Sequence, residues 1–289
     1  MKILHAILSL GFYGSERYCI ELAAAQARAG HDVAVLIRDA NSNCAREFRR
    51  ELSSLDPAHR AKICLSIIPA WLPRWLHRAF ATVVLTRLKP DIVHSHLNSA
   101  ARRVGAVAQR LGIRHVTTLH IKYDRREHEA CDGLIAISNW QIKSMPQYVQ
   151  DKATVIGPWL PRAVEKALAN TTLEDAADLR SEWKVDDSTY VFGSVGRLQQ
   201  EKGMDILLLA FHEAFPNPSE PVALVIVGEG PEGHRLKELT VNDSRRIFLG
   251  ARSDVARIYR AIDAFVSWLD SNRSELRSWK RWRQDFLSY

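Results

Sequence analysis

Residues 190–214 read YVFGSVGRLQQEKGMDILLLAFHEA, and this stretch decides the fold. The apolar run Tyr190–Val195 predicts a buried strand, and Met204–Ala214 predicts a helix. The loop between them carries Arg197 and Lys202. A helix N-terminus adds backbone N–H donors and partial positive charge, so loop and helix together predict a clamp for a diphosphate. Such a clamp also stabilises the negative charge that develops on a phosphate leaving group. The alternative is an ordinary solvated loop.

The alternation of strands and helices extends outward from this stretch in both directions. It starts at the N-terminus, pauses near residue 158 and restarts near residue 188, which predicts an α/β fold of two Rossmann-like domains with parallel sheets. In such sheets ligands bind beyond the carboxyl ends of the strands. The predicted strands are Ile3–Leu8, Asp32–Ile37, Asp91–His94, Val116–Leu119, Leu134–Ile137, Tyr190–Val195, Ala223–Val227, Arg246–Leu249 and Ala264–Ser267, and the predicted helices include Glu16–Ala29, Met204–Ala214, Glu232–Leu239 and Val255–Ala261.

The domain boundaries follow from this rhythm. We assign residues 1–157 to the first domain and residues 188–267 to the second. Residues 158–187, with two prolines and an Ala/Glu-rich stretch, are expected to be a linker containing one or two helices. Because the second domain has only four predicted strands before the pattern stops, we expect it to be incomplete. Residues 268–289 carry three tryptophans and no strand-length apolar run, so they are expected to be an aberrant tail.

The charge is distributed unevenly along the 289 residues. Residues 1–150 hold 21 Lys and Arg against 12 Asp and Glu, a net +9, and the remainder is −2, which together give the overall +7. This predicts an acidic partner for the first half, such as anionic lipid, a phosphorylated acceptor or nucleic acid. A solvated basic face is the alternative. Residues 71–78, WLPRWLHR, interleave bulky apolar and basic side chains; they would lie in a membrane interface or pack against the domain.

Other features favour a cytoplasmic protein. The four cysteines are scattered and include no C-x-x-C pair, which argues against a disulfide framework or a zinc site. Residues 1–10 lack a small-residue cleavage site and are expected to be a strand and not a signal peptide. No apolar run approaches the roughly 18–20 residues that a membrane-spanning helix needs.

Three motifs lie at strand ends in the first half. In residues 11–16, GFYGSE, only Gly11 and Gly14 are present, so the dinucleotide pattern G-x-G-x-x-G is missing and a nicotinamide cofactor is not expected. His94 and His96 share one face of a strand, so a metal site is conceivable, but no third ligand is evident in the sequence. His120 closes the strand 116–119 and faces the expected ligand edge, unless it is a hydrogen-bonded structural histidine.

Several motifs together resemble the GT-B glycosyltransferases of family 4 over residues 1–267. They are GSE at 14–16, KPDIVHSH at 89–96, DGLIAIS at 132–138, the Arg197 to Gly203 loop, GEGP at 228–231 and FLG at 248–250. The resemblance implies transfer of a sugar, with retention, from a nucleotide-sugar donor to a glycan or glycolipid acceptor of the cell envelope, such as a lipopolysaccharide precursor. The first domain would be the acceptor side and the second would bind the nucleotide sugar.

The resemblance also implies roles for individual residues. Arg197 and Lys202 hold the donor diphosphate and act in catalysis, and His120 lies beside the transferring sugar. Gly14 lets the phosphates approach the first domain, and Gly228, Glu229 and Gly230 belong to the donor site. Apart from the resemblance, Gly228 and Gly230 are expected to let a ligand approach the backbone where a Cβ would clash. No metal or other cofactor is implied, because the two cations replace a metal ion. The expected location is the cytoplasm, with peripheral contact at the inner face of an anionic membrane, and no nucleic-acid partner is expected.

The sequence departs from the family at its end. After the strand 264–267 the family carries an E-x7-E element that contacts sugar and ribose, and this sequence lacks it; Glu275 stands in no such context. A shifted reading of the codons for Trp268 onward permits ARFEPFGTSILEAMAAG, which contains the element. We therefore expect residues 268–289 to be a frameshifted ending and the activity to be impaired. Two other interpretations stay open: an inactive remnant that binds nucleotide, and a non-catalytic basic protein that binds membranes.

Overall fold

The computed structural model describes residues 1–159, 162–240 and 243–267. The chain divides into two compact units, Met1–Pro161 and Arg162–Tyr289, and each is described by itself. The expected tail, residues 268–289, lies outside the described residues.

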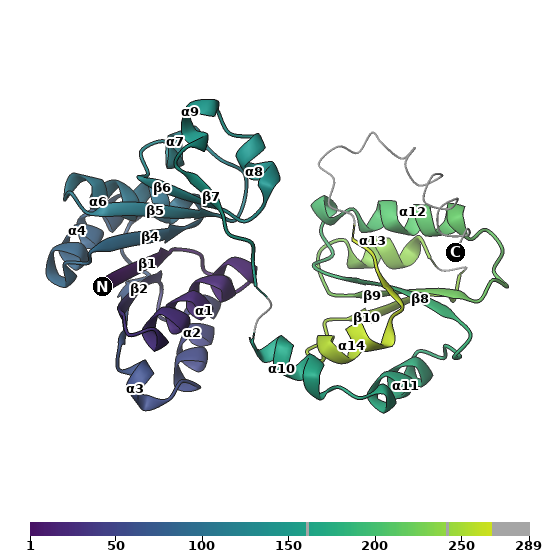
Figure 1. Ribbon diagram of the computed structural model, residues 1–289. Helices are drawn as coiled ribbons and strands as arrows, with labels where there is room; N and C mark the ends of the chain where they lie inside the picture. The colour runs from purple at the N-terminus through teal and green to yellow at the C-terminus, as the bar shows by residue number, and fades with distance from the viewer. Residues whose placement is uncertain (160–161, 241–242, 268–289) are drawn as a thin grey trace. The chain divides into compact units, whose positions relative to one another are not determined.

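The first unit is built on a parallel sheet of seven strands in the order β3-β2-β1-β4-β5-β6-β7 (Figure 1). The strands are β1 (Lys2–Ile7), β2 (Asp32–Arg38), β3 (Ile63–Ile68), β4 (Ile92–His96), β5 (Arg114–Leu119), β6 (Gly133–Ala136) and β7 (Ala153–Val155). The helices are α1 (Gly14–Arg28), α2 (Asn43–Ser53), α3 (Pro57–Arg60), α4 (His77–Leu88), α5 (Leu97–Ala100), α6 (Ala106–Arg110), α7 (Arg125–His128), α8 (Asn139–Lys143) and α9 (Gln147–Gln150), with a 3₁₀ turn η1 (Arg74–Leu76) and a π-helical turn η2 (Ala101–Gly105).

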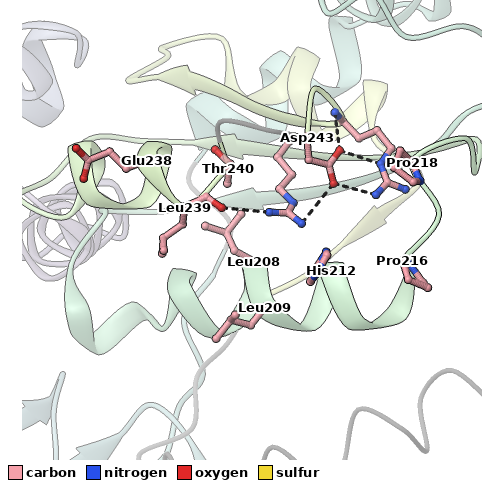
Figure 2. Close-up of a pocket in the computed structure, with 11 residues that line it drawn as sticks. Leu208, Leu209, His212, Pro216, Pro218, Glu238, Leu239, Thr240 and Asp243 are labelled. Carbon is pink, nitrogen blue, oxygen red and sulfur yellow. Dashed lines mark hydrogen bonds and ion pairs between the residues drawn. The ribbon is translucent and has the colours of Figure 1, made fainter.

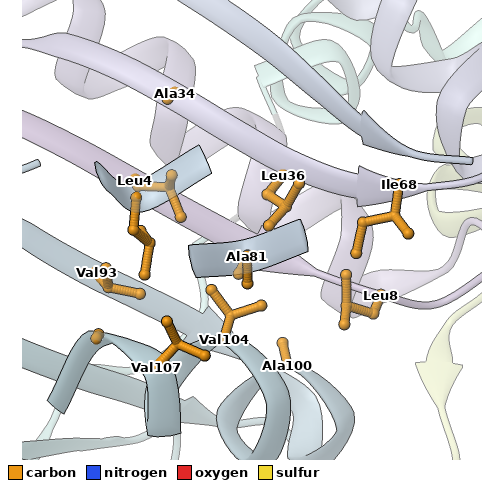
Figure 3. Packing of buried hydrophobic residues seen from close by; sticks show 13 residues of the cluster. Leu4, Leu8, Ala34, Leu36, Ile68, Ala81, Val93, Ala100, Val104 and Val107 are labelled. Carbon is orange, nitrogen blue, oxygen red and sulfur yellow. The ribbon is translucent and has the colours of Figure 1, made fainter. Parts of the chain in front are cut away.

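Both faces of this sheet are buried, as the apolar strands predict. Leu4 and Leu36 pack on one face with residues of α4 and α6, in the cluster that Figure 3 shows. Val33 and Val35 pack on the other face with residues of α1 and α2. Because successive side chains of a strand point to opposite faces, an uninterrupted apolar run is what a sheet covered on both sides requires.

The second unit repeats this plan with a parallel sheet in the order β10-β9-β8-β11. Its strands are β8 (Tyr190–Val195), β9 (Val222–Val227), β10 (Arg246–Gly250) and β11 (Ala264–Phe265), and its helices are α10 (Arg162–Asn170), α11 (Leu173–Glu182), α12 (Met204–Ala214), α13 (Gly233–Glu238) and α14 (Val255–Ala261), with a 3₁₀ turn η3 (Gln200–Lys202). The α/β fold with two Rossmann-like sheets is therefore confirmed. Strand β8 and helices α12 and α14 have the predicted bounds.

The structure differs from the predicted elements in several bounds; β11, for example, ends at Phe265 and not at Ser267, and β4 extends to His96. Strands β3 and β7 were not expected; β3 lies at one edge of the sheet and β7 at the other. Strand β3 carries the apolar run ICLSII, which the sequence analysis overlooked, whereas β7 is only three residues long. Helix α11 falls in the expected linker, yet Leu179 and Trp183 of this region pack into the core of the second unit. The chain divides after residue 161 and not at 157, and Ala176, Leu179 and Trp183 are part of a domain core.

Candidate active site

The loop after β8 carries the two predicted cations. Arg197 is exposed, and Lys202 is partly exposed at the end of η3. Gly203 then takes a left-handed conformation with φ +58° and begins α12, so the N-terminus of that helix directly follows the cations. No described residue forms a salt bridge with the Lys202 ammonium group. Two positive side chains and a helix N-terminus therefore lie on one short loop at the carboxyl end of the sheet, as predicted.

The neighbouring loop after β9 is fastened to this one by backbone hydrogen bonds. The Gly196 N–H donates to the Val227 carbonyl at 2.9 Å, and the Leu198 N–H donates to the Glu229 carbonyl at 3.0 Å. The Glu232 N–H donates in return to the Leu198 carbonyl at 3.0 Å. The exposed Glu229 side chain lies on this loop. Five predicted donor-site residues, Gly228, Glu229, Gly230, Arg197 and Lys202, are thus brought together on two adjacent loops.

The glycines of this second loop have a different physical reason from the predicted one. We expected Gly228 and Gly230 to leave room for a ligand. A Cβ at Gly228 would instead lie 1.9 Å from the carbonyl oxygen of Gly196, and a Cβ at Gly230 would lie 2.3 Å from the carbonyl oxygen of Leu198. Gly228 also has φ +138°, a conformation that L side chains rarely adopt. These glycines let the two loops pack backbone against backbone.

Gly14, by contrast, borders open space. It is the first residue of α1 and is exposed, and a Cβ added there would meet no atom within 4 Å. Glu16, which the sequence analysis used only as part of a motif, is buried and holds the turn: it accepts hydrogen bonds from the Tyr13 N–H at 2.8 Å and the Ser15 hydroxyl at 3.1 Å. The start of α1 is thus ordered by protein groups and open at Gly14.

His120 follows β5 directly and belongs to a group of histidines. Its ring nitrogen Nε2 lies 3.2 Å from Nδ1 of the buried His96, and Tyr18 packs edge-on against its ring with centroids 5.1 Å apart. Burial lowers the pKa of His120 to about 4, against a smaller opposite effect of the Glu16 charge. His120 is therefore a neutral imidazole at neutral pH, able to donate one hydrogen bond and accept another.

The structure also supplies a histidine that sequence reasoning missed. His5 on β1 joins His94 and His96, and each of the three offers a nitrogen within 4.8 Å of the others, so the group meets the rough spacing of a metal site. Its members are already hydrogen-bonded: His5 to Gln26 and to His96, and His94 to the Thr118 hydroxyl at 2.7 Å. A histidine within a buried apolar strand was the signal available in the sequence.

Figure 2 shows a pocket of about 290 Å³ beside α12 and α13. It opens near the start of β10, at the amino ends of the strands, and so away from the loops that carry Arg197 and Lys202. Its cations already have partners: Arg245 and Arg246 both pair with Asp243, and Arg245 donates to the Phe215 and Asn217 carbonyls. This pocket is therefore not the predicted donor site.

The tryptophans of residues 71–78 are exposed. Trp71 has 78% and Trp75 has 76% of its surface accessible, whereas Leu72 between them packs against the core. Of the two predicted arrangements, packing against the domain therefore holds for Leu72 and for the fully buried His77, and not for the two tryptophans. Within the part of the chain that the structure describes, every helix is too short or too polar to cross a bilayer.

The chain matches two family models and two curated relatives. The family model described as Glycosyltransferase Family 4 matches residues 12–161, and the model described as Glycosyl transferases group 1 matches residues 189–275. The chain is 26% identical over 224 residues to an alpha-monoglucosyldiacylglycerol synthase of Streptococcus pneumoniae, a match that covers 67% of this chain and 50% of that protein. It is 27% identical over 262 residues to a GDP-mannose-dependent alpha-mannosyltransferase of Corynebacterium glutamicum, covering 82% and 59%.

Solved structures show the same fold. A glycosyltransferase from Rickettsia africae superposes with a TM-score of 0.72 at 18% identity, covering 92% of this chain and 72% of that one. Anabaena HepE in complex with UDP and glucose gives a TM-score of 0.69 at 21% identity, covering 92% and 73%. The chain spans 50% and 59% of the length of the two curated relatives. The first family match covers more than half of the 289 residues, and the chain therefore belongs to glycosyltransferase family 4.

Proposed function

We propose that the protein transfers a sugar, with retention of configuration, from a nucleotide-sugar donor to a glycolipid or glycan acceptor of the cell envelope. The observation that carries this proposal is the loop of residues 196–203, which places Arg197 and Lys202 beside the N-terminus of α12. Membership of glycosyltransferase family 4 supports it, as does the likeness to a curated relative named as GDP-mannose-dependent.

The loop suits a diphosphate better than a single carboxylate. A diphosphate carries charge on two phosphorus centres, and the loop offers two cations separated by a turn together with the backbone N–H groups that open α12. As the bond from the sugar to the diphosphate breaks, negative charge grows on the leaving oxygen, and the two cations stabilise it. In this proposal they do the work of a divalent metal ion, and the leaving phosphate helps to deprotonate the acceptor hydroxyl.

The acceptor belongs to the first, basic unit. Residues 1–150 have a net charge of +9, and exposed Trp71 and Trp75 flank Arg74 on η1. Tryptophan rings favour the boundary between water and lipid, and arginine favours anionic headgroups. The relative named as an alpha-monoglucosyldiacylglycerol synthase supports a lipid acceptor. We propose a cytoplasmic protein that contacts the inner face of the membrane peripherally through this segment.

The transfer itself is tested with labelled UDP-glucose and GDP-mannose and with vesicles that contain diacylglycerol. The account predicts label in the lipid fraction from at least one donor, an α-linkage by NMR, and a rate that EDTA does not lower. A rate that depends on added divalent metal would contradict the role given to Arg197 and Lys202. Hydrolysis of both donors without transfer to any lipid or glycan would contradict the assigned reaction.

The membrane contact is tested separately by co-sedimentation with vesicles of phosphatidylglycerol or phosphatidylcholine. The paired change Trp71→Ala and Trp75→Ala should reduce binding to the anionic vesicles, and added salt should reduce it further. Trp140→Ala is the matched control, because Trp140 is also exposed, at 56%, but lies on α8. Equal loss of binding in the control would contradict the assignment of this segment.

A further inference from the structure

A row of hydrogen-bonded imidazoles crosses the ligand end of the first sheet. His5 lies on β1, His96 on the adjacent β4, and His120 directly after β5. His5 and His96 have no exposed surface, whereas His120 is partly exposed. The row begins at Gln26 on α1, whose side-chain oxygen lies 2.6 Å from Nε2 of His5. It therefore runs from a helix surface, through the buried sheet, to the predicted sugar site.

The rings face one another head-on. His5 Nδ1 and His96 Nε2 are 3.1 Å apart while the ring centroids are 5.4 Å apart, a difference of 2.3 Å. His96 Nδ1 and His120 Nε2 are 3.2 Å apart with centroids at 5.5 Å, again a difference of 2.3 Å. That difference is the sum of two distances from ring centre to ring nitrogen, so each pair of nitrogens lies on the line that joins the two rings. This is the geometry of an N–H donating into the lone pair of the next ring.

The same geometry argues against a metal ion between these rings. A zinc ion in a protein is tetrahedral and binds histidine nitrogen at about 2.0–2.1 Å, so two ligand nitrogens lie about 3.3 Å apart and their lone pairs converge on the ion at an angle. The nitrogens of His5 and His96 instead point at each other along one line, 3.1 Å apart, and the second nitrogen of each ring also has a partner. A shared proton fits this alignment and a metal ion does not.

The direction of the row follows from its first member. The Gln26 oxygen can only accept, so Nε2 of His5 must carry the proton and donate. Burial lowers the pKa of His5 to about 4 and that of His96 well below its ordinary value, so each ring holds a single proton at neutral pH. Nδ1 of His5 must then accept from Nε2–H of His96, and Nδ1 of His96 must accept from Nε2–H of His120.

We propose that Gln26, His5 and His96 are positioning residues that fix the tautomer of His120, with the proton on Nε2 and the lone pair of Nδ1 available to accept a hydrogen bond from a substrate hydroxyl. The tautomer is inferred from the hydrogen-bond contacts of these residues, whereas the identification of a substrate hydroxyl as the partner of Nδ1 rests on the proposed function. Tyr18, packed edge-on against the His120 ring, helps to hold its plane. The other tautomer would present a donor at the same place and would repel a hydroxyl proton.

The tautomer is measured on the full chain with ¹⁵N-labelled histidine, because long-range proton–nitrogen spectra distinguish protonated from unprotonated ring nitrogens. The proposal predicts a proton on Nε2 and none on Nδ1 in His5, His96 and His120. A proton on Nδ1 of His120 would overturn it. So would Zn²⁺ that binds the unaltered chain and shifts the ring signals of His5 and His96.

Two variants at position 26 test whether Gln26 sets the tautomer of His120 through His5 and His96. Gln26→Glu keeps an acceptor oxygen and should leave all three tautomers in place at pH 8, which keeps the His5 ring neutral although the added carboxylate raises its pKa. Gln26→Met fills similar volume but offers only the weak thioether acceptor, and should give mixed ring signals at His120. Gln26 is only partly buried, so both variants are expected to fold, and urea unfolding checks this. A His120 spectrum that stays the same in folded Gln26→Met would overturn the proposal.

Transfer kinetics separate this proposal from the proposed function. Gln26→Met should lower kcat about tenfold with little change in KM for the donor, the effect of one hydrogen bond at the reacting sugar, and Gln26→Glu should restore it. An equal loss in both variants would contradict the positioning role. If the unaltered chain transfers no sugar, the proposed function fails, while the ring-nitrogen spectra still decide the tautomer.

Discussion

Gly228→Ala tests whether the two donor-site loops are held together by glycine. Gly228 has φ +138°, and a new Cβ would lie 1.9 Å from the Gly196 carbonyl oxygen, which is backbone and cannot rotate away. Backbone strain of this kind costs about 1–3 kcal/mol. Overpacking costs about another 1–3 kcal/mol. We expect the second unit to lose about 2–6 kcal/mol of its free energy of unfolding, a large share of the roughly 5–15 kcal/mol typical of a domain.

The assay is urea unfolding followed by near-UV circular dichroism, which reports on the buried Trp183 in the core of the second unit. Gly233→Ala is the matched control, because a Cβ there meets Leu198 Cδ1 only at 3.5 Å, an ordinary contact. It should change stability by less than about 1 kcal/mol. A Gly228→Ala chain that is as stable as the unaltered chain would refute the packing argument, and equal destabilisation of both variants would show that the loop rejects any side chain.

Two further predictions concern the first unit. Gly14→Ala should keep or slightly raise the free energy of unfolding, because the new Cβ at the start of α1 would meet no atom within 4 Å. The same change should weaken the binding of a nucleotide sugar, which calorimetry measures with Gly157→Ala as control. Unchanged affinity would remove Gly14 from the donor site. Burial lowers the pKa of His5, His115 and His128 to about 4, below the usual 6.5, so the unfolded chain binds protons first as the pH falls. Stability should be complete above about pH 6.5 and fall by up to about 1.4 kcal/mol per pH unit for each histidine toward pH 4; urea unfolding curves that coincide at pH 7 and pH 5 would contradict this.

The sequence predicts most of the fold because the two sheets are buried on both faces. The run of β9 is apolar throughout, and those of β1, β2 and β8 are apolar apart from two residues each, which in runs of six or seven residues indicates strands. Strand β3 has the same apolar pattern, ICLSII, and was overlooked, whereas β7 has only three residues and offers too short a run to predict a strand. Helix α11 was placed in a linker because nothing local shows that Leu179 and Trp183 pack against a distant strand.

Part of the candidate site could likewise be predicted from the sequence, and part could not. The positions of Arg197 and Lys202 follow from chain order, since a strand, a loop and a helix occur within 25 consecutive residues. His5 and His96 are 91 positions apart, and the sequence does not show that their strands are neighbours in the sheet. The role of Gly228 also depends on a partner in another loop, Gly196. The spacing of residues along the chain predicts which side chains share one loop, whereas contacts between distant residues depend on the order of the strands in the sheet.

The central claim is that Arg197 and Lys202 grip the diphosphate of a nucleotide-sugar donor. Titration calorimetry with UDP and with GDP, in the presence of EDTA, measures this directly. The account predicts that Arg197→Ala weakens binding of the preferred nucleotide by about 1.5–3 kcal/mol, the range for a hydrogen bond to a charged group. Lys237→Ala, which removes an exposed lysine of α13, should leave the affinity unchanged. Equal affinity in Arg197→Ala, Lys237→Ala and the unaltered chain would contradict the claim.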